Sequence, residues 1–368
     1  MKSRMNSQTE SEMGKVRIGL IGVGNIAQRH ALAHTNDANA EIHAVCDVNQ
    51  ERVEQRAEEW GAAKAYTDYH DLLADADVDA VEIITPHHLH ARMGLDALEA
   101  DKHVSMQKPM ATTIAECDDL IAAANRSDRI FRTFENFQYF PPVMKAKELL
   151  DSGAIGEPLS IRMKTIMGTK EGWEVPYERW SWRFDPEQGG GGRVMFDYGS
   201  HVFALAFYFM GDVEKVFSWI SYKTIQHGWK IDCPAVVIWK YKDADKYGSF
   251  EVIQSDDILI QSTHVPEDEW FEITGSRGFI WVNRCSSMLL DAPPVVMYRD
   301  GVTTNYSDMA TDWSESFNAG CSEFVDAILA GTQPKLTAED GKKVLRMCRG
   351  IELSARECRE VILDSRVE

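Results

Sequence analysis

The stretch Val16-Arg17-Ile18-Gly19-Leu20-Ile21-Gly22-Val23-Gly24-Asn25-Ile26-Ala27 decides the fold of this protein. It begins as a short apolar run typical of a buried strand and continues as a helical pattern. The turn between them fits G-x-G-x-x-G/A, whose glycines permit a tight turn and a close approach of the backbone to a pyrophosphate. The N–H groups and dipole of the following helix N-terminus favour that anion. The turn is therefore predicted to bind a dinucleotide through Gly22, Gly24, Asn25 and Ile26.

An acidic residue ends the second predicted strand. The strand Ile42–Cys46 is followed by Asp47, about 20 residues beyond the turn, as in the dinucleotide-binding fingerprint. A carboxylate at this point accepts hydrogen bonds from the ribose hydroxyls and repels a 2′-phosphate. The sequence therefore favours NAD over NADP as the cofactor. The alternative interpretation is that the glycines are ordinary turn residues and that Asp47 is a solvated helix cap.

Strands and helices alternate as far as residue 138. Further apolar strands are predicted at Ala80–Ile84 and His103–Met106, and a helical pattern follows each of them. This alternation is typical of an α/β domain with a parallel sheet and right-handed crossovers. We predict that residues 1–14 are poorly ordered and that residues 15–138 form a Rossmann domain that binds NAD(P).

The pattern changes in the second part of the chain. Strands in which apolar and polar residues alternate dominate from Val216 to Val282, and this predicts an antiparallel sheet with one solvated face. One of these strands is expected at Ile258–Thr263. Two helices, Phe317–Ala330 and Ala338–Cys358, are predicted to close the chain. Residues 139–368 are therefore predicted to form an α+β domain with a large open antiparallel sheet.

Composition limits the classes of partner. The 368 residues carry a formal net charge of -19, which argues against nucleic acid or an anionic membrane as the main partner. The seven cysteines are scattered and include no CxxC pair, so reduced thiols and a cytoplasmic location are predicted, without a disulfide framework or a metal site. The apolar runs fall short of the roughly 18–20 residues of a membrane span.

A lysine follows the strand His103–Met106. Gln107-Lys108-Pro109 lies at the carboxyl edge, where open α/β sheets bind their ligands. The lysine can hydrogen-bond a substrate hydroxyl there and stabilise the alkoxide charge that develops as hydride leaves. The alternative interpretation is a solvated lysine, which is the commonest environment of that residue type.

A carboxylate and a histidine follow a run of four glycines, Gly189 to Gly192. Asp197 and His201 are four residues apart and would share one face of a helical turn. A histidine tuned by a carboxylate suits a general base that takes the hydroxyl proton during hydride transfer. The alternative is that Asp197 caps a helix and that His201 is a partly buried polar group.

An aromatic loop precedes the glycine run. In it, Trp182 can stack on a sugar face and Arg183 can donate to hydroxyl groups. These residues are predicted substrate contacts, with packing between subunits as the alternative. The complete predicted substrate-binding set is Lys108, Trp182, Arg183, Asp197 and His201.

The chain resembles the glucose–fructose oxidoreductase / inositol dehydrogenase (Gfo/Idh/MocA) family from Val16 to about Val361. The resemblance rests on the motifs GVGNIA, TPHHLH, KHVSMQKP, SGAIGEP, WRFDPEQGGGG, DYGSH and LTAEDGKKVLRMCRGIELSA. It implies NAD(P)-dependent oxidation or reduction of a sugar or cyclitol carbinol, and homo-oligomers, dimers or tetramers, built through the antiparallel sheet. It also implies that the catalytic group is Lys108, Asp197 and His201, and that the cofactor contacts include Thr85, Pro86, His90, Gln107 and Lys108.

Three positions depart from the family pattern. Gln107 replaces the usual Glu and removes one negative charge beside Lys108. Ala204 stands where many members carry a second Asp, three residues past the histidine. His87 occupies a position that is usually Asn. These departures put the cofactor contact at His87 and the partners of the predicted catalytic helix in question.

The sequence predicts an NAD-dependent oxidoreductase that oxidises a secondary hydroxyl of a sugar, glycoside or cyclitol to a ketone. In this prediction His201 is the base, Asp197 orients it and Lys108 polarises the carbinol oxygen. One alternative is a glycoside 3-oxidase that keeps its NAD bound and recycled and whose product primes deglycosylation. An alternative from another class is a catalytically silent regulator that senses NAD(H).

Overall fold

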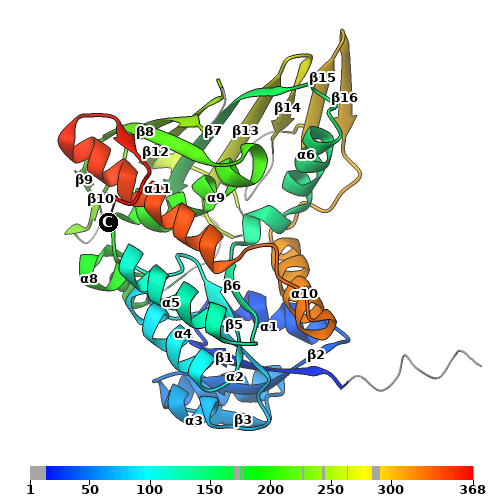
Figure 1. Ribbon diagram of the computed structural model, residues 1–368, viewed down its shortest axis with the longest axis vertical. Coiled ribbons are helices and arrows are strands. Elements are labelled where there is room, and N and C mark those ends of the chain that lie inside the picture. Colours follow the sequence, from blue (N-terminus) through cyan, green and yellow to red (C-terminus); the bar gives the residue numbers. More distant parts are fainter. Residues whose placement is uncertain are drawn as a thin grey trace, which may run out of the picture.

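The computed structural model describes residues 14–169, 175, 177–225, 228–242, 245–262, 264–283 and 291–367. The segment predicted to be poorly ordered, residues 1–14, lies outside the described residues except for Gly14. The described chain forms two lobes, each built on one large sheet (Figure 1). Within these ranges, no helix combines the length and the apolar character needed to cross a bilayer.

The N-terminal lobe is a six-stranded parallel sheet. Its strand order is β3-β2-β1-β4-β5-β6, the doubly wound order, which confirms the predicted Rossmann fold. The strands are β1 (Val16–Ile21), β2 (Ala40–Cys46), β3 (Lys64–Tyr66), β4 (Ala80–Ile83), β5 (His103–Gln107) and β6 (Phe131–Phe134). The connecting helices are α1 (Ala27–Asn36), α2 (Gln50–Trp60), α3 (Tyr69–Leu73), α4 (His90–Glu99) and α5 (Ile114–Arg126).

Local signals set the ends of these helices. The side chains of Asn49 and Asp68 cap α2 and α3 by accepting backbone N–H groups. Thr113 and Glu116 form a reciprocal capping box at the start of α5. Gly61, with φ 69°, ends α2 in the left-handed conformation. The capping box of α5 thus sets the end of the loop after β5, which carries Lys108.

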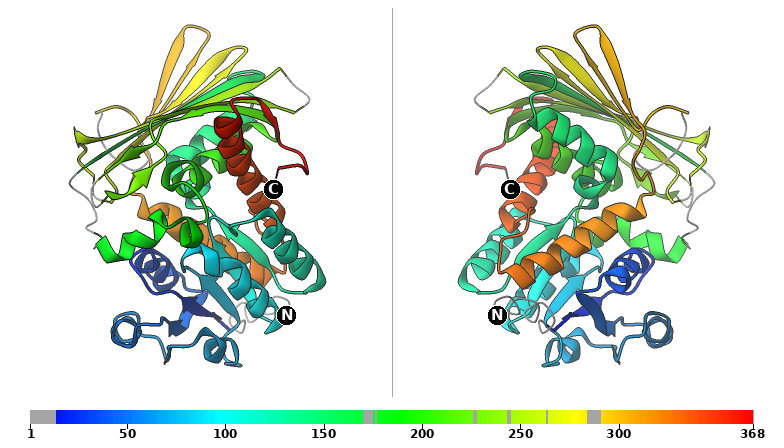
Figure 2. Two further views of the ribbon diagram at one scale, coloured as in Figure 1. Left: turned by 90° about the vertical axis from the view of Figure 1, so that its left-hand side faces the viewer. Right: turned by 90° about the vertical axis from the view of Figure 1, so that its right-hand side faces the viewer.

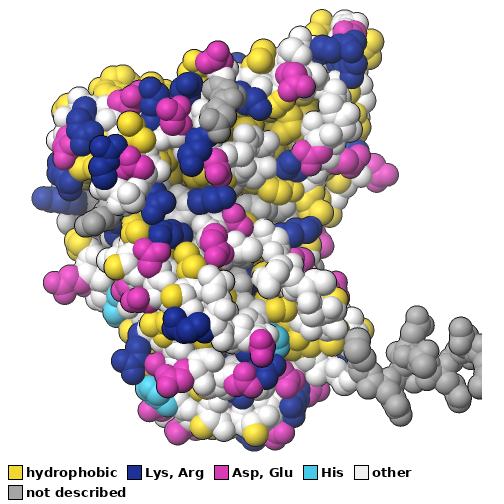
Figure 3. All heavy atoms as spheres, in the orientation of Figure 1, with side chains coloured by type: hydrophobic (Ala, Val, Ile, Leu, Met, Phe, Trp, Pro, Cys, Tyr) yellow, Lys and Arg dark blue, Asp and Glu magenta, His cyan; other side chains and the backbone are white. Residues whose placement is uncertain are grey.

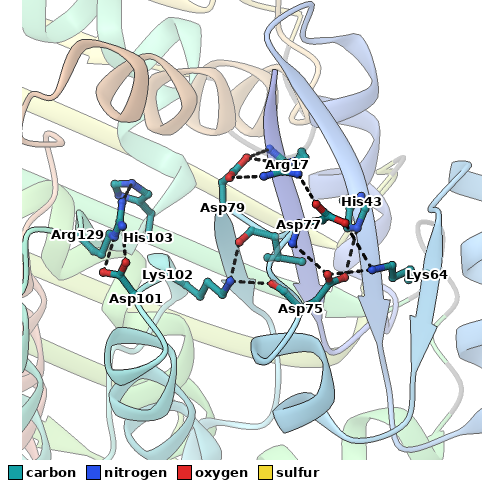
Figure 4. A network of polar contacts seen from close by, with 11 residues as sticks. Arg17, His43, Lys64, Asp75, Asp77, Asp79, Asp101, Lys102, His103 and Arg129 are labelled. Atoms are coloured by element: carbon teal, nitrogen blue, oxygen red, sulfur yellow. Dashed lines mark hydrogen bonds and ion pairs between the residues drawn. The ribbon is translucent and has the colours of Figure 1, made fainter. Parts of the chain in front are cut away.

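Polar contacts tie the strands together at the opposite edge of the sheet, where they begin (Figure 4). Arg17, near the start of β1, donates to Asp79 from its backbone N–H at 2.9 Å and from Nε at 3.1 Å. Lys102 Nζ donates to the carbonyl oxygens of Asp75 and Val78, both at 2.8 Å. This edge is therefore fastened by contacts that join the connections leading into β1, β4 and β5.

The second lobe is built on a nine-stranded sheet with the order β16-β15-β14-β13-β7-β12-β11-β8-β17. Its strands are β7 (Pro158–Thr169), β8 (Val213–Ile220), β11 (Ala235–Tyr241), β12 (Tyr247–Leu259), β13 (Glu267–Gly275), β14 (Gly278–Val282), β15 (Val295–Arg299), β16 (Val302–Tyr306) and β17 (Val361–Ile362). A separate pair contains β9 (Lys223–Thr224) and β10 (Lys230–Ile231). The large open sheet matches the predicted architecture.

The second sheet differs from the sequence prediction in three respects. It is mixed, because β12 runs parallel to β7 after a long connection has returned the chain to its starting edge. The prediction of a separate strand at Ile258–Thr263 is wrong, because β12 continues without a break to Leu259. Thr263 lies outside the described residues. A final short strand, β17, pairs with β8 after the last helix.

Helices cover one face of the nine-stranded sheet and leave the other bare (Figure 2). The longer helices of this lobe are α6 (Pro141–Asp151), α9 (Gly199–Met210), α10 (Ser314–Ala330) and α11 (Ala338–Glu357). The shorter ones are η2 (Asn136–Tyr139), α7 (Tyr177–Trp180), η3 (Ser181–Phe184), α8 (Pro186–Gly189) and the π-helix η4 (Arg193–Tyr198). On the bare face, strand alternation exposes large apolar side chains, among them Trp219, Val236, Ile238, Tyr247 and Ile253.

The two lobes share a helix. α10 comes from the C-terminal part of the chain but packs against α1, and its Phe324 and Val325 belong to the same buried cluster as Ile18 and Leu20 of β1. A single boundary near residue 138 therefore separates the two sheets but not the two cores. On the face seen in Figure 3, Lys and Arg side chains lie among Asp and Glu side chains over both lobes.

Candidate active site

The turn after β1 has the shape that a dinucleotide needs. Gly22 has φ 89°, and a Cβ there would lie 2.7 Å from the carbonyl oxygen of Ile84, so only glycine fits. A Cβ at Gly24 would meet nothing within 4 Å. The N-cap of α1, Ile26, offers no side-chain cap, so the first N–H groups of the helix are open to an anion. These residues fit the pyrophosphate of NAD.

The carboxylate of Asp47 lies beside this turn. Its Oδ2 accepts the backbone N–H of Val23 at 3.2 Å, and Arg52 Nη1 lies 3.1 Å from both carboxylate oxygens. Arg52, from the first turn of α2, is a neighbour that the sequence analysis did not identify. An acidic side chain here receives ribose hydroxyls, whereas a nearby arginine can receive a 2′-phosphate. The site therefore holds groups suited to either form of the cofactor.

The loop after β4 carries Thr85, Pro86, His87 and His90, and the two histidines are buried. The ring nitrogens of His90 lie 2.8 Å from Pro109 O and 2.9 Å from Thr85 O, and burial lowers the pKa of His90 to about 4. A neutral ring donates to one of these carbonyls at a time. His90 thus links the loops after β4 and β5 through its buried ring. Thr85 and Pro86 are themselves partly exposed.

Lys108 and Asp197 form the central ion pair of the site. Lys108 Nζ lies 2.7 Å from Asp197 Oδ1 and donates to the Asp197 carbonyl oxygen at 2.9 Å. Arg183 Nε donates to Asp197 Oδ2 at 3.0 Å, and Arg193 Nη1 lies 3.5 Å from the same oxygen. Burial alone would raise the pKa of Asp197, but Lys108 and the two arginines hold that pKa well below its usual value. The carboxylate is therefore an anion surrounded by three cationic side chains.

His201 lies one turn beyond Asp197 but is held by a different carboxylate. Its Nδ1 lies 2.7 Å from Glu135 Oε1, and the ring of Phe137 stacks on the imidazole at 4.5 Å between centroids. The prediction that Asp197 orients His201 is therefore wrong for this structure, because Lys108 and Arg183 occupy the Asp197 carboxylate. Burial lowers the pKa of His201, and Glu135 opposes that shift.

Gln107 connects Lys108 to a buried histidine. The backbone N–H of Lys108 donates to Gln107 Oε1 at 2.9 Å, and Gln107 Nε2 lies 3.1 Å from His30 Nε2. The other ring nitrogen of His30 lies 2.6 Å from Glu82 Oε2. Gln107 therefore links the backbone of the Lys108 turn to the buried His30 side chain.

The two predicted substrate residues of the aromatic segment reach the same place. The guanidinium of Arg183 lies 4.3 Å from the centroid of the Trp182 ring, and that ring meets His87 edge-on at 4.7 Å. His87 also lies 3.6 Å from Asp197 Oδ1, and its Nδ1 is 2.8 Å from Gly189 O. Burial lowers the pKa of His87 well below its usual value. The neutral ring thus separates Asp197 from the glycine run.

Besides Arg52, three residues of the site were not identified from the sequence. They are Glu135, Arg193 and Glu267, and burial raises the pKa of Glu267. Glu135 directly follows β6, at the same carboxyl edge of the sheet as Lys108. Because open α/β sheets bind ligands at that edge, the position of Glu135 could have been recognised from the sequence. Arg193 sits four residues before Asp197 in η4, but only the folded π-helix shows that the two side chains meet.

Comparison with known proteins identifies the family of the chain. Residues 16–134 match the model of the oxidoreductase family with an NAD-binding Rossmann fold, and residues 143–281 match the GFO/IDH/MocA C-terminal domain, together more than half of the chain. A myo-inositol 2-dehydrogenase of Thermotoga maritima is 28% identical over 356 residues, covering 95% of this chain and 99% of that protein. A levoglucosan dehydrogenase of Pseudarthrobacter phenanthrenivorans is 29% identical over 59% of this chain and 57% of its own length.

The same fold occurs in solved structures. A levoglucosan dehydrogenase in complex with NADH and L-sorbose superposes with a TM-score of 0.82 at 23% identity, over 96% of this chain and 100% of that one. The Rossmann turn, the Lys108 turn and the Asp197–His201 helix thus lie in a two-lobe fold whose sequence matches both family models. The chain belongs to the Gfo/Idh/MocA family of NAD-binding oxidoreductases.

Proposed function

We propose that this protein is an NAD-dependent dehydrogenase that oxidises a secondary hydroxyl of a sugar, glycoside or cyclitol to a ketone. The observation that carries this proposal is the contact of Lys108 Nζ with Asp197 Oδ1 at 2.7 Å, one helical turn from His201. Besides burial, the charge of Lys108 also lowers the pKa of His201, which supports a proton donor and a candidate base in one site at the edge of the Rossmann sheet. The inositol and levoglucosan substrates named for its relatives support the substrate class.

Each residue has a distinct task in this reaction. Lys108 Nζ donates to the carbinol oxygen and stabilises the negative charge that develops on it. His201 takes the hydroxyl proton at Nε2, because its Nδ1 faces Glu135. Asp197 holds the Lys108 side chain in place. NAD, when bound, supplies the nicotinamide ring that accepts the hydride.

Trp182 and Arg183 are proposed to select the substrate. Arg183 is fixed by Asp197 and by the face of Trp182, so its remaining donors have a defined direction. A flat indole beside a fixed guanidinium suits a ring that carries several hydroxyls. A sugar or glycoside fits this pair better than a small hydroxy acid.

Asp47 supports NAD as the cofactor. Its carboxylate lies beside the phosphate turn and within reach of an adenosine ribose placed there. Comparing turnover with NAD and with NADP, at matched concentrations, tests this assignment. A preference for NADP would show that Arg52 decides the choice.

Two variants test the proposed reaction. Lys108→Met and His201→Ala are each expected to bind NADH as the wild type does, while turnover falls by about 10²–10⁴-fold. NADH formation is measured across a panel of monosaccharides, inositols and aryl glycosides. Near wild-type rates in both variants would contradict the proposal.

One contact favours the alternative in which NAD is kept and recycled. Arg179 of α7 donates to the side-chain oxygen of Asn25, so its side chain reaches over the phosphate turn. A cofactor beneath it would have to displace that contact to leave. Stoichiometric release of NADH indicates a dehydrogenase, whereas exchange of substrate without net NADH indicates recycling. A silent NAD(H) sensor has less support, because the site keeps Lys108, Asp197 and His201.

A homo-oligomer joined through the bare face of the nine-stranded sheet is part of this proposal. That face exposes Trp219, Ile238 and Tyr247, which a second copy of the chain would cover. The six described cysteines, Cys46, Cys117, Cys233, Cys321, Cys348 and Cys358, are free thiols, which supports a reducing, cytoplasmic location.

A further inference from the structure

A cavity lies behind the predicted catalytic base. It has a volume of about 290 Å³, lies between α9 and α11, and is lined by Lys108, Thr133, Glu135, Ser200, Ala204 and Tyr208 among others. The same cavity reaches Gly211, Asp212, Lys335 and Lys343, which are exposed. His201 and Asp197 are not part of its lining. The cavity therefore reaches Glu135 but not the imidazole that Glu135 contacts.

The two carboxylate oxygens of Glu135 differ in their contacts. Its Oε1 accepts the backbone N–H of Phe137 at 2.9 Å and lies 2.7 Å from His201 Nδ1. Its Oε2 is buried and has no hydrogen-bond partner among the described residues, although only 3% of the residue is exposed. Thr133, which lines the same cavity, likewise keeps its Oγ1 buried and without a hydrogen-bond partner among the described residues. Two residues of the cavity lining thus each keep a polar atom whose hydrogen-bonding capacity is unused.

We propose that Glu135 is the positioning residue of His201 and that the cavity between α9 and α11 gives small carboxylates from solution access to this position. The inference rests on the proposed role of His201 as the base. A carboxylate at Oε1 keeps the imidazole proton on Nδ1 and leaves Nε2 to receive the hydroxyl proton. It also balances the imidazolium charge that forms when the carbinol gives its proton to His201 and its hydride to NAD.

Two features make this role specific to Glu135. The Phe137 ring, stacked at an interplanar angle of 13°, and the Glu135 carboxylate together allow the imidazole one orientation. Ala204, whose side chain is a single methyl group, lies on the cavity wall and leaves space there. A volume of about 290 Å³ exceeds the roughly 30 Å³ of a single water several-fold, so formate or acetate can enter.

The experiment is chemical rescue of Glu135→Ala. The variant is expected to bind NADH with wild-type affinity and to lose about 10²–10⁴-fold in kcat. Added formate is expected to restore at least a tenth of the lost activity in a saturable manner. Acetate should rescue less well, and benzoate, whose ring is larger than the side-chain volume that the substitution removes, should not. A kcat within threefold of wild type, or a loss that no carboxylate restores, would overturn the proposal.

Two further variants separate the possible failures. His201→Ala is expected to show the same reduced turnover with and without formate; if its turnover is near that of the wild type, the proposed function fails, whatever Glu135 does. Glu135→Gln keeps an oxygen acceptor for Nδ1 but removes the charge, and its kcat is expected to fall between those of the wild type and the Ala variant. This substitution nearly preserves shape, so it remains informative if Glu135→Ala does not fold. Full activity of Glu135→Gln would contradict the charge-balancing role.

Discussion

The amide nitrogen of Gln107 faces His30, with Nε2 to Nε2 at 3.1 Å. The direction of this amide is fixed, because the backbone N–H of Lys108 requires Oε1 as its acceptor. His30 must therefore accept at Nε2 and carry its proton on Nδ1, which faces Glu82 at 2.6 Å. The same logic argues against a metal ion at the buried group of His30, Glu82 and Cys321, because Nδ1 is protonated.

Gln107→Glu tests this hydrogen-bond direction. The new carboxylate would place an oxygen acceptor against the lone pair of His30 Nε2 in place of the amide donor, which costs about 1–3 kcal/mol of unfolding free energy. Denaturant unfolding of the wild type and the variant near neutral pH measures this loss. A variant as stable as the wild type would show that the two side chains do not interact.

A second prediction concerns the buried ion pair. Asp197→Asn leaves Lys108, Arg183 and Arg193 without their shared anion, and we expect a loss of about 3–5 kcal/mol in unfolding free energy. The depressed pKa of Asp197 fixes the sign of the pH effect. Its contribution is complete above the unfolded pKa, near 3.8, and is lost only as pH falls toward the lower folded pKa.

Unfolding curves of the wild type and Asp197→Asn near neutral pH measure this loss of unfolding free energy. Lys108→Met is the matched control, because it removes one of three cations and leaves Asp197 paired with Arg183. The control should cost less stability than Asp197→Asn but more activity. Equal stability losses in the two variants would contradict a shared anion.

The pH dependence of turnover provides a third prediction. Burial lowers the pKa of His201, so the neutral base is available at pH 6.5 and is lost only on further acidification. Lys108 also lowers this pKa, whereas Glu135 and Asp197 raise it. The acid limb of kcat/KM should therefore lie below pH 6.5 in the wild type and move lower still in Glu135→Gln. A limb that moves upward would contradict the contact between Glu135 and His201.

The contrast between Glu135 and Asp197 shows what a sequence can predict here. The strand–turn–helix pattern predicts β1, the glycine turn and the position of Lys108, because each depends on residues that are adjacent in the chain. The partner of His201 depends on how η2 packs against α9, and Glu135 lies 66 residues away in sequence. The Asp-x-x-x-His spacing predicts a shared face but not that the carboxylate is taken by Lys108 and Arg183.

The choice of cofactor yields a fourth prediction. Asp47→Ser removes the negative charge beside the phosphate turn and frees Arg52 to approach a 2′-phosphate. The preference for NAD over NADP in kcat/KM should fall by about tenfold or more, equivalent to about 1.4 kcal/mol. The double variant with Arg52→Ala should lose NADP use again. An unchanged preference would place cofactor selection elsewhere.

The bare sheet face provides the last prediction. Trp219 of β8 is 62% exposed and pairs in register with Val236 of β11, while Ile238 is 45% exposed on the same face. Because contiguous apolar patches on a sheet favour association, Ile238→Lys is expected to dissociate the proposed oligomer and to make the melting temperature depend less on concentration. Light scattering after gel filtration measures the mass. Leu32→Lys is the matched control, since Leu32 is equally exposed, at 45%, but lies on α1 in the other lobe. A mass unchanged by Ile238→Lys, or reduced equally by the control, would place the interface elsewhere.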